Sequence, residues 1–256
     1  MKSATLLALA GIAVLAGCQS PSDVVVRQKT STTGMVERET QSTQYWTSEM
    51  MIVDDDSNRI IIDFAGERLT AADKQKKTYN VVSFNQMRAA MDQARARMAQ
   101  ESGGLGPDAK AALSGMGEPI GAEGIVDVKP TGKREKIAGY DAEEYSFVGS
   151  AVSGTLWVSK DLPLPLGKKA KEAYIASTAG MRAPGRQFAL AMVETNGIPL
   201  RTAMNVALGP NGTTTTNEVT EVRREPPPPE MRRVPEDFAP AAPAPPASVE
   251  PPNPAP

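Results

Sequence analysis

The sequence predicts an α+β fold in which short antiparallel strands precede and follow a long helix. Over residues 24–82, apolar and polar residues alternate in short runs separated by polar turns, a pattern typical of a meander of antiparallel strands with one apolar face. From residue 84 the apolar residues recur every three or four positions, which predicts an amphipathic helix over Asn85 to Gln100. Strand-like alternation returns after residue 124.

Five strands are expected before the helix. They cover Val24 to Thr33, Tyr45 to Val53, Arg59 to Phe64, Glu67 to Ala71 and Lys77 to Val82. Successive side chains of a strand point to opposite faces of a sheet. The residues expected to share a face are Val24, Val26, Gln28 and Thr30 in the first strand, Trp46, Met50 and Ile52 in the second, and Ile60, Ile62 and Phe64 in the third.

The acidic turn between the second and third strands has the spacing of a calcium loop. Asp54, Asp56 and Asn58 repeat the oxygen pattern that opens an EF-hand. Such a loop needs glycine at its sixth position and glutamate at its twelfth, where this chain has Arg59 and Ala65. We therefore expect a polar hairpin turn and no metal site.

The expected helix carries a stripe rich in methionine. Phe84, Met87, Met91, Ala94 and Met98 follow one another at spacings of three and four. This stripe is typical of a helix that packs on a core. Methionine also offers an adaptable, polarizable surface to apolar ligands of varied shape. The sequence leaves both interpretations open.

The second half of the chain predicts a further set of strands and helices. A looser, glycine-containing stretch runs from Ser102 to Gly124 and includes a weak helix over Pro107 to Ser114. The expected elements after it are strands over Gly124 to Pro130, Glu143 to Gly149 and Ser153 to Lys160, a helix over Lys168 to Ala179, a helix or strand over Gln187 to Glu194, and a hairpin of Arg201 to Leu208 with Thr213 to Arg223.

Composition excludes several classes of function. The formal net charge is −2 and there is no histidine. A chain without a basic field is a poor partner for nucleic acid, and a chain without histidine lacks the usual general base and the commonest zinc ligand. The carboxylates of Asp127, Glu143 and Glu144 are not placed by any catalytic motif. We expect no enzymatic activity, no metal and no cofactor.

The N-terminus has the pattern of a secretory signal peptide. Lys2 precedes an apolar run over Thr5 to Leu15, which is shorter than the roughly 20 residues that span a bilayer. The run closes on Leu15-Ala16-Gly17-Cys18, which contains the chain's one cysteine. This tetrapeptide resembles the lipobox of bacterial lipoproteins. The resemblance implies a signal peptide over residues 1–17, cleavage before Cys18, and acylation of that cysteine with chains such as palmitate.

In that lipoprotein class an aspartate after the cysteine retains the protein in the inner membrane. Gln19 stands there in this chain, so the resemblance implies an outer-membrane anchor with the protein facing the periplasm. Residues 18–23 form a short tether, and a single domain is expected over residues 24–225.

The C-terminus changes sharply in composition. Of the 22 prolines in the chain, 13 lie between Pro226 and Pro256, mixed with alanine. Such a segment favours extended polyproline geometry and buries little apolar surface. The sequence predicts a disordered tail over residues 226–256, either a plain spacer or a segment that docks on the cell wall or on another envelope protein.

Three short motifs resemble a family of bacterial envelope proteins whose domain has no assigned function. They are Val128-Lys129-Pro130-Thr131-Gly132, Lys136-Ile137-Ala138-Gly139-Tyr140, and Leu156-Trp157-Val158-Ser159-Lys160-Asp161. Lys76 to Tyr79 and Val234 to Phe238 also fit this family. Its domains are similar in plan to the LolA/LppX lipid carriers, in which a curved antiparallel sheet forms a half-barrel around helices. The concave side of that half-barrel holds acyl chains.

The resemblance implies a lipid-anchored protein that binds an apolar or amphiphilic ligand on the concave side of its sheet. The expected lining residues are Trp46, Met50, Ile62, Phe64, Phe84, Met87, Met91, Met98 and Trp157. The alternative is a non-enzymatic structural or interaction module of the envelope that uses its proline-rich tail.

Overall fold

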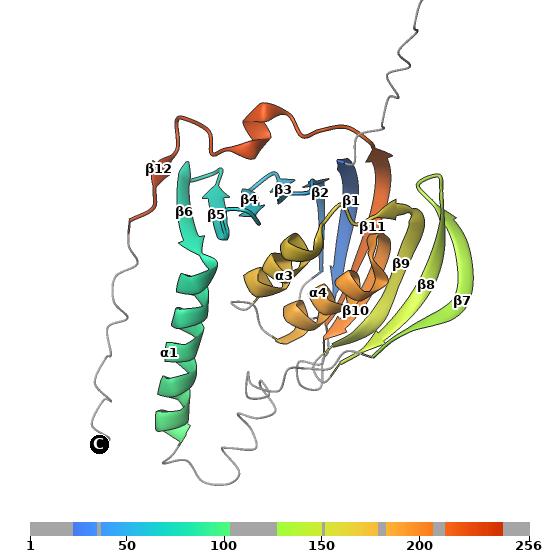
Figure 1. Ribbon diagram of the computed structural model, residues 1–256, viewed down its shortest axis with the longest axis horizontal. Coiled ribbons are helices and arrows are strands. Elements are labelled where there is room, and N and C mark those ends of the chain that lie inside the picture. The colour runs from blue at the N-terminus through green and yellow to red at the C-terminus, as the bar shows by residue number, and fades with distance from the viewer. Residues whose placement is uncertain are drawn as a thin grey trace, which may run out of the picture.

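One large, open sheet forms the body of the protein. The computed structural model describes residues 23–34, 37–102, 127–149, 152–178, 183–206 and 213–242. In that part the sheet has 12 strands in the order β12-β6-β5-β4-β3-β2-β1-β11-β10-β9-β8-β7. It curves around the helices α3 and α4 (Figure 1). The expected fold class, an α+β half-barrel of antiparallel strands around helices, is confirmed.

The strands run as follows: β1 (Val24–Thr33), β2 (Arg38–Trp46), β3 (Met50–Asp55), β4 (Asn58–Asp63), β5 (Arg68–Asp73), β6 (Thr78–Ser83), β7 (Asp127–Ile137), β8 (Tyr140–Val148), β9 (Val152–Pro163), β10 (Gly197–Val206), β11 (Thr213–Arg223) and β12 (Ala239–Pro240). The helices are α1 (Phe84–Ser102), α3 (Lys168–Ser177) and α4 (Ala183–Thr195), with a 3₁₀ helix at Pro229–Arg232. Neighbouring strands are antiparallel except for β12, which pairs in parallel with β6.

Strand β1 joins the two halves of the sheet. It pairs with β2 on one side and with β11 on the other, so that Val26 faces both Gln44 and Val222. The N-terminal meander β1–β6 therefore continues directly into the C-terminal meander β7–β11. Nine residues of β1, Val24 to Thr32, pair with β2 without interruption, which fixes the face of their side chains.

The expected strand over Tyr45 to Val53 is in fact two strands. Strand β2 ends at Trp46, and the Thr47 hydroxyl oxygen accepts hydrogen bonds from the backbone N–H groups of Glu49 at 3.2 Å and Met50 at 2.9 Å. The turn breaks the alternation, and Trp46 pairs in register with Met51. Met51, and not Met50, therefore shares a face with Trp46.

The expected polar turn between β3 and β4 is confirmed. A carboxylate oxygen of Asp55 accepts hydrogen bonds from the backbone N–H groups of Ser57 and Asn58, both at 2.7 Å. Asp54 is ion-paired with Arg59 at 2.8 Å and with Lys74 at 3.0 Å. The acidic residues of this turn thus cap the hairpin and bind cationic side chains.

The two faces of the sheet bury different clusters. The concave face, which we define as the side that contacts α3 and α4, carries Val24, Val26, Trp46, Met51 and Ile62. The convex face carries Val25, Tyr45, Ile52 and Ile61, which form a separate buried cluster. Alternation along the strands sorts these residues to opposite sides.

The segment Gln187 to Glu194, which the sequence left open between helix and strand, lies in helix α4. The side chains of α4 cover β9, where Ala191 and Leu156, each 0 % exposed, belong to one cluster with Phe147. Phe147 and Phe188 make an edge-to-face contact with ring centroids 6.1 Å apart. Helix α3 begins after the extended stretch that follows Pro163 and lies beside α4 (Figure 1).

Helix α1 confirms the helix expected from the methionine stripe. Its N-terminus is closed by a capping box, in which the Ser83 hydroxyl accepts from the backbone N–H of Gln86 at 3.1 Å and the Gln86 side chain accepts from the backbone N–H of Ser83 at 2.9 Å. Phe84 is 1 % exposed. None of the helices among the described residues has the length and apolar character that crossing a bilayer requires.

The prediction that disorder begins at Pro226 is wrong for residues 226–242, here called the C-terminal arm. The arm runs along the convex side of the meander β1–β6 and ends as β12 beside β6 (Figure 1). Proline content alone suggested a tail, but Met231 packs on the convex cluster and the backbone of the arm is hydrogen-bonded to the sheet. Residues 243–256, as well as the expected helix over 107–114, lie outside the described residues.

Candidate functional site

Four of the expected lining residues meet on the concave face. Trp46, Ile62, Phe64 and Phe84 belong to one buried cluster and are exposed by 2 %, 2 %, 5 % and 1 %. Tyr174 of α3 fills the space between them, with its ring centroid 6.1 Å from those of both Trp46 and Phe64. These four residues therefore do share one apolar surface, which α3 covers.

The hydroxyl of Tyr174 is buried with these rings. It donates to the sulfur of Met192 at 3.6 Å, and burial raises the pKa of this phenol well above its usual value. A neutral phenol in an apolar core is the state that burial favours. This end of the concave face is thus a packed core.

The expected lining residue Met50 lies elsewhere, whereas Trp157 belongs to the same buried cluster as the four. Met50 packs on the convex cluster with Tyr45 and Ile52, so its assignment to the concave lining is wrong, because the turn at Thr47 reverses the alternation. Trp157 is 8 % exposed and contacts the main core cluster. However, Leu156 contacts the α4 side of β9, so alternation turns Trp157 to the other side.

Trp157 lies beneath an ion-pair bridge that the sequence did not reveal. The guanidinium of Arg201 is 5.8 Å from the centre of the indole ring and binds Glu135 at 2.7 Å and Glu218 at 2.9 Å. The hydrogen bond from Arg201 holds the pKa of Glu135 below its usual value. The bridge connects β10 with its neighbour β11 and with the more distant β7, and no local motif signals it.

The methionine stripe of α1 is placed in part. Met87 is half-buried and packs against the main core cluster. Met91 and Met98 lie within α1, although their side chains are outside what the structure describes. At about 100° per residue, both positions fall within about 40° of Met87 around the helix axis. The other sides of the first turns of α1 are exposed, at Asn85, Arg88 and Ala89.

Beyond the apolar core, the concave face carries a neutral polar strip. The amide nitrogen of Gln28 donates to Ser42 at 3.2 Å, and the hydroxyl of Thr30 donates to Asn217 at 2.7 Å. The amide of Asn217 in turn donates to Thr202 at 3.0 Å. The first four of these residues are half-buried, and Thr202 is 3 % exposed. The alternation of Val24, Val26, Gln28 and Thr30 in the sequence already signalled this arrangement.

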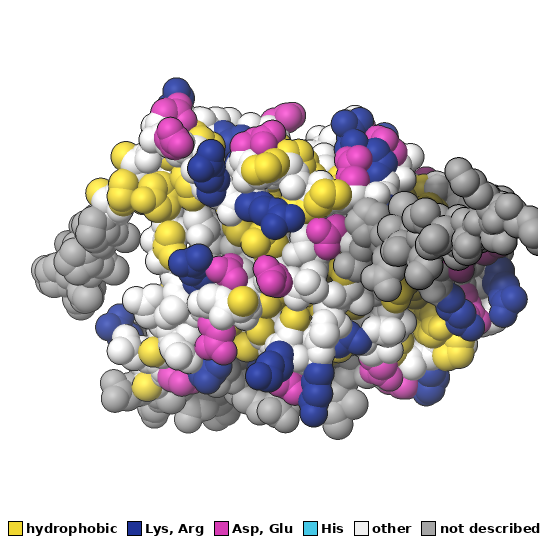
Figure 2. All heavy atoms as spheres, turned by 45° about the horizontal axis from the view of Figure 1, so that its top comes forward, with side chains coloured by type: hydrophobic (Ala, Val, Ile, Leu, Met, Phe, Trp, Pro, Cys, Tyr) yellow, Lys and Arg dark blue, Asp and Glu magenta, His cyan; other side chains and the backbone are white. Residues whose placement is uncertain are grey.

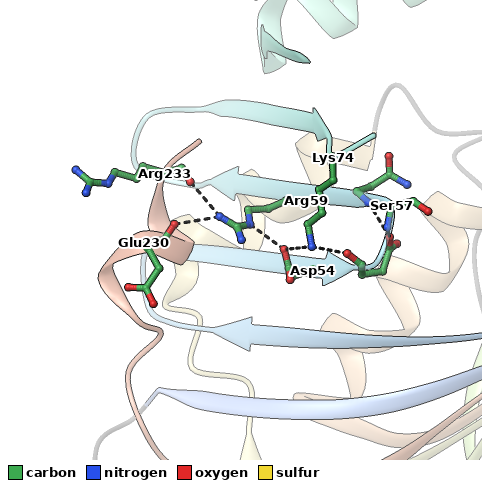
Figure 3. Close-up of polar contacts among 8 residues, drawn as sticks. Asp54, Ser57, Arg59, Lys74, Glu230 and Arg233 are labelled. Carbon is green, nitrogen blue, oxygen red and sulfur yellow. Dashed lines mark hydrogen bonds and ion pairs between the residues drawn. The ribbon is translucent and has the colours of Figure 1, made fainter. Parts of the chain in front are cut away.

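On the convex side, Arg59 holds the C-terminal arm. Its Nε pairs with Asp54 at 2.8 Å, and its Nη1 donates to the backbone carbonyls of Glu230 at 3.0 Å and Arg233 at 3.4 Å (Figure 3). The side chain of Arg59 is only 10 % exposed. Lys74, which also binds Asp54, donates to the carbonyl of Asp55.

The face seen when the top of Figure 1 is turned forward carries charges of both signs. Figure 2 shows acidic and basic side chains interspersed with apolar ones. At the edge of the arm, for example, Lys77 pairs with Asp237 at 2.8 Å. Basic residues here are matched by acidic ones, in keeping with the net charge of −2.

Three solved structures are similar to this chain at low sequence identity. The chain is similar to the structure of PNGF-II, with 10 % identity, a TM-score of 0.37, and coverage of 79 % of this chain and 28 % of that one. It is similar to MucB, with 9 % identity, a TM-score of 0.37, and coverage of 84 % and 58 %. It is also similar to the LolA superfamily protein NE2245 from Nitrosomonas europaea, with 10 % identity, a TM-score of 0.31, and coverage of 82 % and 90 %.

The chain thus spans less than a third of PNGF-II and a little over half of MucB. No curated protein matches the sequence. A family profile does match in the second half of the chain, in the region of the three short motifs. Residues 122–238 of this protein match the family described as Domain of unknown function (DUF4412).

Proposed function

We propose that this chain is a lipid-anchored protein of the outer membrane that holds an apolar or amphiphilic molecule between α1 and the concave face of its sheet. The observation that carries the proposal is the methionine stripe of α1, which joins the concave core at Met87 and continues along the helix. Binding would rest on apolar area, at about 25 cal/mol per Å² removed from water.

The packed core decides which part of the concave face is used. Trp46 and Phe64 are in contact with Tyr174, so a ligand at that point would have to displace α3. Helix α1 begins on the same core at Phe84 and continues away from the end of β6 (Figure 1). The region bounded by Met87, Met51 and Ile60, all partly buried against the core, is therefore the place for an acyl chain.

The anchor at Cys18 would keep this face near the membrane. Strand β1 begins at Val24, six residues after the cysteine. Six extended residues reach about 20 Å. Ligands would then be exchanged directly with the bilayer.

Native mass spectrometry of the full chain, purified from membranes in detergent, tests the proposal. We expect co-purified lipid that is lost in the double variant Met91→Gln and Met98→Gln, because polar amides would weaken apolar contacts along the stripe. The control is Ala89→Gln, an exposed position on the opposite side of α1. A wild-type protein that carries no lipid would contradict the proposed function.

A second candidate, a structural or interaction module, draws on the C-terminal arm. The arm ends beside β6, where the backbone N–H groups of Ala239 and Ala241 donate to Lys77 at 3.0 Å and Tyr79 at 2.7 Å. Deletion of residues 243–256, with the arm retained, should remove envelope partners and leave lipid content unchanged if this candidate is correct.

A further inference from the structure

The concave face sorts its side chains by polarity along β1. Val24 and Val26 are buried, and Gln28 and Thr30 follow on the same face, half-buried and uncharged. The charged residues of this strand lie on the convex side, where Arg27 pairs with Glu221 at 3.1 Å and Lys29 pairs with Glu39 at 2.8 Å. The concave side of β1 thus passes from apolar to neutral polar without a charge.

The neighbouring strands repeat this order. On β2 the concave face reads Trp46, Gln44, Ser42, Thr40, and Gln44 accepts a hydrogen bond from the indole N–H of Trp46 at 3.1 Å. On β11 it reads Val219 and then Asn217, where Asn217 is joined to Thr30 and Thr202. Three adjacent strands therefore share one boundary between apolar and neutral polar groups, and Thr202 of β10 extends the polar side.

This neutral polar strip is defined by Gln28, Thr30, Ser42, Thr202 and Asn217. The first charged side chain on this face of β2 is Arg38, which is exposed at the start of the strand. The hydroxyl and amide groups of the strip offer both donors and acceptors. A charged group bound there would lose hydration without gaining a counter-ion from the strip, whereas a hydroxyl-bearing group would exchange water for matched hydrogen bonds.

From this arrangement we infer that the ligand is an amphiphile whose headgroup is uncharged and rich in hydroxyl groups, as in an acylglycerol or a glycolipid. The headgroup binds the polar strip, and the acyl chains lie on the apolar half of the face beside α1. The inference rests on the proposed function and adds to it the chemical class of the ligand. The strip is uncharged and therefore matches an uncharged headgroup. This match selects the class of ligand.

The test is binding of lipids that differ only in their headgroups. The full chain is incubated with detergent micelles that contain either monoglucosyl diacylglycerol or phosphatidylglycerol with the same acyl chains, and bound lipid is measured by native mass spectrometry. We expect the glucosyl lipid to be preferred. Thr30→Val should lower that preference about fivefold, the effect of one lost hydrogen bond, while Thr30→Ser should retain it.

Ser31→Val is the matched control, since Ser31 lies on the convex face of the same strand, opposite Thr216 and Glu39 in register. Thermal unfolding of each variant shows whether the fold is retained. Equal binding of both lipids by the wild type, unchanged in Thr30→Val, would overturn the inference and leave the proposed function intact. Binding of neither lipid, together with lipid-free protein from membranes, would overturn both.

Discussion

Arg59 donates a hydrogen bond at 3.0 Å to the backbone carbonyl of Glu230, which is 171 residues later in the chain. This contact ties β4 to the C-terminal arm, and Met231 beside it covers the convex cluster. A buried guanidinium paired with Asp54 thus fixes a proline-rich segment on the sheet.

Replacing Arg59 should release the C-terminal arm. Arg59→Leu removes the ion pair with Asp54 and the donors to Glu230 and Arg233. Hydrogen bonds to charged groups contribute about 1.5–3 kcal/mol, so we expect the free energy of unfolding to fall by about 2 kcal/mol in a denaturant titration. Hydrogen exchange at the Ala239 and Ala241 amides should accelerate at the same time.

Arg233→Leu is the control for this change. The Arg233 side chain is 69 % exposed, and only its backbone carbonyl accepts from Arg59. Its substitution should leave exchange in the arm close to that of the wild type. Unchanged exchange in Arg59→Leu would show that Arg59 does not hold the arm.

Two glycines should respond oppositely to the same substitution. A Cβ at Gly154 would lie 2.0 Å from the carbonyl oxygen of Ala203, between β9 and β10, so Gly154→Ser should destabilise by about 1–3 kcal/mol. Gly167 is the N-cap of α3 and has open space around it. Gly167→Ser should be neutral or slightly stabilising, because serine is a preferred N-cap. Similar unfolding midpoints for the two variants would contradict the close β9–β10 approach.

Alkaline unfolding should depend on Tyr174. Burial raises the pKa of this phenol above its unfolded value of about 10. Its contribution to stability is therefore complete below pH 10 and is lost as the pH rises above that value. In Tyr174→Phe, the fall in melting temperature above pH 10 should be shallower than in the wild type. Identical slopes would show that the phenol titrates in the folded protein.

The sequence predicted the sheet better than its ends and turns. Regular alternation in β1 and the 3–4 spacing in α1 predicted both elements, because each pattern depends only on local periodicity. The break at Thr47 was missed, since the hydrogen bonds of a side-chain-capped turn leave no signal in polarity. The ordered arm was missed because its order comes from Arg59, a contact far away in the sequence.

The candidate site, too, was predicted only where local periodicity decides the position of a residue. Trp46, Ile62, Phe64 and Phe84 were predicted on one apolar surface and do meet there. That α3 covers them could not be predicted from any pattern in the strands. Met50 was misassigned because the turn at Thr47, rather than composition, decides which face it occupies.

The proposed anchor makes its own prediction. Cys18→Ser should shift the protein from the membrane fraction to the soluble fraction of fractionated cells. Without Cys18 the polypeptide carries no acyl groups to anchor it in the bilayer. Mass spectrometry of the N-terminal peptide is the direct readout, with a gain equal to the attached acyl groups in the wild type. An unmodified cysteine in the wild type would refute the anchor.

Photo-crosslinking in membranes tests the central claim most directly. A phospholipid precursor with a diazirine on its acyl chain is fed to cells, the full chain is purified after irradiation, and labelled peptides are identified by mass spectrometry. The account predicts labels on α1 (Phe84–Ser102) and on the strands that carry Met51 and Ile60. Labels confined to the convex side around Met231, or found on the N-terminal peptide alone, would contradict it.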